Sequence, residues 1–150
     1  MPRGPVRHIL VLVDGSESSF EAARYAIQLA KAFKARLTAV GIVDTATLRH
    51  LLSTHIMVAA EMEEYERELT ESSRRHLAYV AEQAKDAGVK IHTALLRGAV
   101  HSAVLAEQKT TGADLIVIGA FRWTLAHRDH AARERQLIVD EAPCPVLIVR

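Results

Sequence analysis

The sequence has little cysteine, few aromatic residues and almost no net charge, and each shortage excludes a class of protein. The single cysteine, Cys144, rules out an internal disulfide and is typical of a reducing compartment. The formal net charge is only +1 at pH 7, so no overall field attracts nucleic acid or an acidic membrane. Apolar runs stay well short of the roughly 20 residues that a membrane span needs, and the amino-terminal residues lack a signal-peptide cleavage pattern. We therefore expect a cytoplasmic protein that binds neither nucleic acid nor membrane.

Recognisable catalytic and metal-binding motifs are also missing. There is no Gly-x-Ser-x-Gly elbow, Walker A loop or HExxH helix, and no convincing nucleophile–base pair. His127 and His130 lie three apart, but no third ligand or carboxylate is placed with them to complete a metal site. Cys144 stands between two prolines beside an apolar run, which favours a packed, inert thiol. We expect no enzyme and no metal, with weak nucleotide hydrolysis as an open alternative.

Short apolar runs alternate with amphipathic stretches along the 150 residues. The runs predict strands over residues 8–13, 37–43, 89–96, 115–118 and 146–149. The stretches between them predict a helix capped by Ser18 with Glu21 as a capping box, and helical regions over about 47–87, 99–111 and 129–140. The region 47–87 is long enough to form one helix or two.

This alternation of continuously apolar strands with helices is typical of a parallel sheet covered on both faces. No linker, low-complexity tract or internal repeat interrupts it. We expect one doubly wound α/β domain over residues 1–150, in which residues 1–7 form a loose lead-in.

Three segments together resemble the universal stress protein family: HILVLVDGSESSFEAARYAIQLAKAFKARLTAVGIVD, GADLIVIGA and APCPVLIVR. The resemblance implies a Rossmann-like, adenine-nucleotide α-hydrolase-like sheet of five parallel strands in the order 3-2-1-4-5. The strand order then opens a crevice where Asp14 and Gly119 end their strands. It also implies a homodimer that pairs through the exposed edge strand Val146–Val149, with a tetramer as the open alternative.

Family members that bind ATP carry Gly-x-x-Gly, nine further residues, and Gly-Ser or Gly-Thr. Their glycines let the backbone approach the phosphates, which the hydroxyl and amides at a helix start then hold. In this chain the four positions fall on Gly119, Arg122, Ala132 and Arg133, so three of the four are altered.

Other family contact positions persist. By resemblance, Asp14 matches the acid that faces the nucleoside, and Ile42 matches the position whose backbone meets the adenine. Gly98 keeps the turn glycine before the third helix, whereas Leu12 and Val100 replace prolines found in family members.

The arginines at the altered positions have two interpretations. They either fill the former phosphate pocket, pairing with Asp14, Asp129 or Glu134, or capture an anion in place of the glycine backbone. The first predicts a non-catalytic stress-response homodimer with a degenerate pocket, acting through a regulatory protein partner. The second predicts a regulatory protein that binds ATP, AMP or another phosphate-bearing anion between Asp14, Ile42, Gly119 and the arginines.

Overall fold

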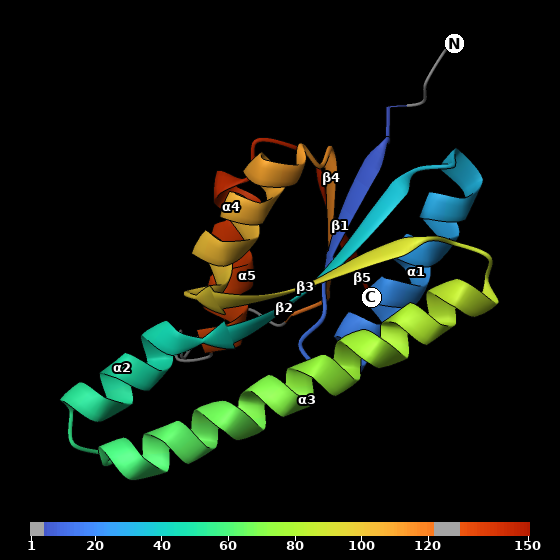
Figure 1. Cartoon of the computed structure of the whole chain (residues 1–150). Coiled ribbons are helices and arrows are strands. Elements are labelled where there is room, and N and C mark those ends of the chain that lie inside the picture. Colours follow the sequence, from blue (N-terminus) through green and yellow to red (C-terminus); the bar gives the residue numbers. More distant parts are fainter. Residues whose placement is uncertain (1–4, 122–129) are drawn as a thin grey trace.

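The computed structural model describes residues 5–121 and 130–150. Five parallel strands form one sheet in the order β3-β2-β1-β4-β5, which confirms the predicted fold class and strand order (Figure 1). The strands are β1 (His8–Leu12), β2 (Arg36–Asp44), β3 (Ile91–Gly98), β4 (Leu115–Gly119) and β5 (Val146–Val149). The helices are α1 (Glu17–Phe33), α2 (Thr45–Ser53), α3 (Ala59–Asp86), α4 (Val100–Thr111) and α5 (His130–Glu141).

Helices cover both faces of the sheet, and the central strand shows why its sequence is apolar throughout. Ile9 and Val11 pack into a core with α1 and the second half of α3, whereas Leu10 and Leu12 pack into a second core with α4 and α5 (Figure 1). Successive side chains of a strand point to opposite faces, so a strand buried on both sides needs no polar residue. These four side chains are 0–2% exposed.

The start of α1 differs from its prediction. Ser16, not Ser18, is the N-cap, and its hydroxyl accepts a hydrogen bond from the N–H of Ser19 at 3.2 Å. Asp14 closes the turn early, because its carboxylate accepts from both the N–H and the hydroxyl of Ser16. Glu21 pairs with Arg24 on the helix surface, so the predicted capping box is wrong.

The predicted long helical region forms two helices, α2 and α3. The second half of α3 contributes Leu77 and Val80 to the main core, whereas its first half packs on α2 and the ends of β2 and β3. There Met62 joins Leu48 and Val43 in a small separate cluster. We call residues 45–70 the α2–α3 arm; Figure 1 shows it projecting beyond the sheet.

Candidate functional site

A small cavity lies beyond the carboxyl ends of β1 and β2, where α5 crosses the end of the sheet. Its volume is about 190 Å³. The described residues that line it are Leu12, Asp14, Ile42, Asp44, Val100, His130, Ala131, Glu134 and Arg135. This is the edge at which an open α/β sheet places its ligands.

An ion pair between Asp14 and Arg135 joins the end of β1 to α5. Arg135 is only 6% exposed, and its Nη2 donates to one carboxylate oxygen of Asp14. The other oxygen accepts from the N–H and hydroxyl of Ser16, at 2.9 and 2.6 Å. Burial works to raise the pKa of Asp14, but the Arg135 guanidinium and the Ser16 hydrogen bonds outweigh it and hold that pKa below its ordinary value. Asp14 is therefore an ionised group whose two oxygens are both engaged.

A second pair connects α5 to the end of β2. The Nε2 of His130 lies 2.7 Å from Asp44 Oδ2. Asp44 also caps α2, since its oxygens accept from the N–H and hydroxyl of Thr47 at 3.0 and 2.8 Å. Burial again acts to raise the pKa of Asp44, and the Thr47 and His130 hydrogen bonds lower it below its ordinary value.

A third pair connects α5 to α4. The buried carboxylate of Glu134 lies 2.8 Å from Nδ1 of His101 and accepts from the His101 backbone N–H at 3.3 Å. The three acids that line the cavity thus already have donors from the chain itself. A ligand using any of them must displace one of these donors.

Only some of the site residues predicted from the sequence line this cavity. Asp14 and Ile42 line the cavity, and Gly98 ends β3 with a φ of +128°. Arg133 lies on the exposed side of α5 and is not among the lining residues. Arg122 lies outside the described residues, as do His127, Arg128 and Asp129.

Gly119 and Ala132 have structural roles at their positions. A Cβ on Gly119 would lie 2.6 Å from the backbone carbonyl of Ser18, so this glycine lets β4 pass close to the start of α1. Ala132 is buried on α5, at 3% exposed.

Asp44 and His101 belong to the site but were not among the predicted site residues. The place of Asp44 was foreseeable, because it ends β2 as Asp14 follows β1, and acids after neighbouring parallel strands meet at one edge of the sheet. His101 carried no comparable signal, because only the packing of α4 on α5 brings it to Glu134.

Two features are absent from the described ranges, 5–121 and 130–150. No cluster of three or more His, Cys, Asp or Glu side chains there is arranged to hold a metal ion. None of the helices there is long and apolar enough to cross a membrane.

The family model described as the universal stress protein family matches residues 5–150. The chain belongs to this family. A universal stress protein of Methanocaldococcus jannaschii is 33% identical over 146 residues, covering 96% of this chain and 82% of the relative.

Solved universal stress proteins have the same fold. One from Burkholderia pseudomallei superimposes with a TM-score of 0.73 at 27% identity, covering 99% of this chain and 98% of that one. A universal stress protein in complex with cAMP gives a TM-score of 0.69 at 24% identity and covers 97% of both chains. At 24% identity, the likeness to the cAMP complex shows the fold alone.

Proposed function

We propose that this universal stress protein acts without catalysis, as a cytoplasmic stress-response protein whose nucleotide pocket is closed by its own side chains. The observation that carries the proposal is the ion pair of Asp14 and Arg135. By family resemblance Asp14 is the acid that faces the nucleoside, and here the buried Arg135 guanidinium takes that place. The protein then signals through a protein partner rather than through a bound nucleotide.

The size of the cavity supports the same conclusion. Sites for small molecules typically enclose about 300–1,000 Å³, whereas this cavity encloses about 190 Å³. A nucleotide seated on Asp14 would have to move Arg135 and leave a buried guanidinium without its carboxylate. Removing one partner of a buried charge pair is costly in free energy. Solvent reduces that cost here, because the Asp14 side chain is 33% exposed.

A thermal-shift screen with millimolar ATP, ADP, AMP and cAMP tests the closed pocket. We expect no shift for the wild-type protein. A ligand at about a hundred times its dissociation constant would add roughly 2.7 kcal/mol and raise Tm by a few degrees. Arg135→Ala, which frees Asp14, should gain a shift with adenine nucleotides, and the exposed Arg133→Ala serves as the control that stays flat.

Tight ATP binding by the wild-type protein, checked by calorimetry, would overturn the closed pocket. Phosphate release from ATP at high protein concentration would overturn the absence of catalysis.

The second candidate function is a switch regulated by an adenine nucleotide or another phosphate-bearing anion. It is favoured by Nε of Arg135, a buried donor with no acceptor among the described residues. A solved relative of the same fold also holds cAMP. This candidate predicts the opposite screen: a shift with AMP or cAMP in the wild-type protein that Arg135→Ala abolishes.

We also propose a homodimer through β5. Among the described strands, β5 pairs only with β4, so its other edge is open, and Ile148 is 39% exposed there. Light scattering should give about 33 kDa, twice the 16.5 kDa of one chain. Ile148→Lys should give the monomer mass, whereas Ile56→Lys, an equally drastic change at a side chain 65% exposed on the arm, should not. A wild-type monomer would refute the dimer.

A further inference from the structure

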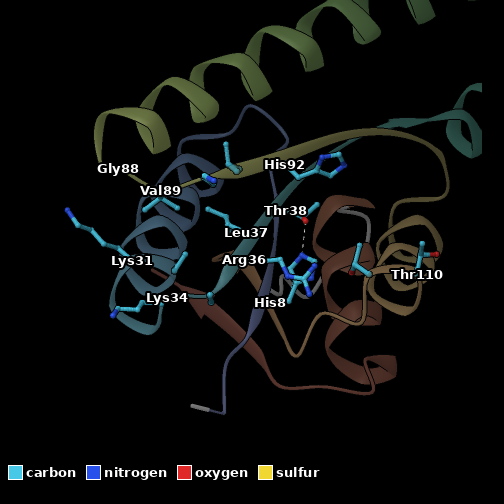
Figure 2. Close-up of a pocket in the computed structure, with 15 residues that line it drawn as sticks. His8, Lys31, Lys34, Arg36, Leu37, Thr38, Gly88, Val89, His92 and Thr110 are labelled. Carbon is cyan, nitrogen blue, oxygen red and sulfur yellow. Dashed lines mark hydrogen bonds between the residues drawn. The ribbon is translucent and has the colours of Figure 1, made fainter. Parts of the chain in front are cut away.

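A hollow larger than the crevice cavity lies at the opposite edge of the sheet. It encloses about 790 Å³ at the amino ends of β1, β2 and β3. Figure 2 shows Lys31 and Lys34 on its α1 side, His92 and Thr110 across from them, and His8 with Arg36 between. Its size falls within the range typical of small-molecule sites.

The charges around this hollow are of one sign. Four cationic side chains line it: Lys31, Lys34, Arg36 and Lys90. No aspartate or glutamate is among the described lining residues, and no ion pair within residues 5–121 and 130–150 involves these four cations. The arrangement is the reverse of the crevice, where each acid has a basic partner. A chain with a net charge of only +1 thus concentrates unneutralised positive charge at one place.

The hollow also has an apolar part and a polar anchor. The partly buried Ala35, Val89 and Ile91 contribute apolar surface just before β2, just before β3 and at the start of β3, and Leu37 lies beneath them at 2% exposed. His8 and Thr38 join across β1 and β2 through a 2.8 Å hydrogen bond between Nε2 and Oγ1. Burial, followed by the charge of Arg36, holds the pKa of His8 below its usual value, although a hydrogen bond with the Thr111 backbone and the charge of Asp114 act to raise it.

Three helix ends and one carboxylate oppose this field without cancelling it. α1, α3 and α4 end beside the hollow, at Phe33, Asp86 and Thr111, and each carboxyl-terminal end carries about half a negative charge. Asp114, whose carboxylate accepts from the backbone N–H of His8, adds one more. Against that total of about two and a half negative charges stand four full positive charges. The hollow therefore keeps a net attraction for anions.

We propose that this hollow binds a small organic phosphate, with a dianionic or more highly charged group held by the four cations and an apolar body on Ala35, Val89 and Ile91. The site does not depend on the crevice or on the function proposed for it. The site should select ligands that combine a phosphate group with an apolar body. Inorganic phosphate lacks the apolar body, and a neutral aromatic compound lacks the charge.

1-Naphthyl phosphate is a suitable probe, because it joins a phosphate dianion to an apolar ring. Calorimetry should show saturable binding that weakens with added salt. Inorganic phosphate and 1-naphthol should each bind at least tenfold more weakly. The double substitution Lys34→Gln with Arg36→Gln should weaken the probe at least tenfold.

Matched variants separate this site from general charge effects and from the crevice. Arg49→Gln with Arg74→Gln removes the same charge from exposed positions of α2 and α3 outside the hollow and should leave the affinity unchanged. Arg135→Ala should also leave it unchanged. NMR shifts should concentrate at His8, Thr38 and Ile91. No binding of the probe at millimolar concentration, or equal losses in both double variants, would overturn the proposal.

Discussion

Gly119 has a reason to be glycine that involves no ligand. The backbone of Ser18 occupies the space that a side chain at position 119 would need, at 2.6 Å from the Cβ position. The carbonyl is main chain and cannot rotate away as a flexible side chain does. The contact fixes the distance between the end of β4 and the start of α1 whether or not the crevice holds a nucleotide.

Gly119→Ala should therefore destabilise the protein by about 1–3 kcal/mol, the usual cost of forcing extra volume into a packed site. Gly88→Ala is the control: its φ is +75° but nothing lies within 4 Å, so only the backbone cost of about 1–2 kcal/mol applies. Urea unfolding measures both variants. A Gly119→Ala variant as stable as the wild type would contradict the contact.

At this scale the sequence identified the right kind of residue but not the right position. The sequence predicts that arginines near the start of α5 either pair with Asp14, Asp129 or Glu134 or capture an anion. Which arginine pairs depends on how α5 is rotated over the sheet, and that rotation is set by the burial of Ala132 and Ile138. Arg135 shares the buried side and Arg133 does not, a difference that tertiary packing decides.

At the scale of elements, the start of α1 offers a direct comparison of two serines. Ser16→Ala removes the hydroxyl that accepts from the N–H of Ser19, and should cost about 1 kcal/mol. Ser18→Ala removes a hydroxyl that lies 3.2 Å from another hydroxyl, that of Ser16, and should cost less than half as much. Thermal unfolding of the pair distinguishes them, and the reverse order would restore Ser18 as the cap.

Helix α5 is attached to three other elements through charged pairs: Asp14 after β1, Asp44 at the end of β2 and His101 in α4. The pKa values of Asp14 and Asp44 both lie below their ordinary values. The unfolded chain therefore binds protons at higher pH than the folded chain does. Their contribution to stability is complete above an unfolded pKa of about 3.9 and is lost as the pH falls through the lower folded values.

Replacing both acids should flatten this acid dependence. In Asp14→Asn with Asp44→Asn, asparagine still caps α2 but neither position can take up a proton. The double variant should be less stable than the wild type at pH 7, and the difference should shrink as the pH falls from about 5 to 2. Chemical denaturation across that range measures it. A constant difference would show that the two carboxylates titrate as they do in the unfolded chain.

For the whole molecule, the sheet was predictable and the arm was not. The central strands β1 and β4 are apolar runs, because a parallel strand covered on both faces has almost no solvent-facing side chain. The edge strand β3 also carries exposed polar residues: His92, Thr93 and Arg97. The strand order, by contrast, came from family resemblance. Nothing in the sequence of residues 45–70 marks where the sheet ends beneath the arm. The exposure of its apolar residues Ile56 and Val58, at 65% and 60%, was therefore not predictable from the sequence.

Hydrogen exchange should divide α3 into two parts. Amides of the half that carries Leu77, Val80 and Ala84 should exchange at the slow rate of β1, because these side chains lie in the main core. Amides of the arm should exchange at least tenfold faster, because the arm depends on the small cluster of Val43, Leu48 and Met62. Uniform protection along the 28 residues of α3 would contradict this division.

The second half of α3 is held in the main core, whereas the first half is held more lightly, by the small cluster around Met62 and by the ion pair of Glu66 with Arg97. This first half is about 14 residues, or roughly 21 Å, long. A rotation of about 5° at the anchored half would move the far tip by about 2 Å, since helices are stiff over this length. A small shift where α3 packs on β2 is therefore magnified at Ile56 and Val58, the apolar residues that the tip presents to solvent.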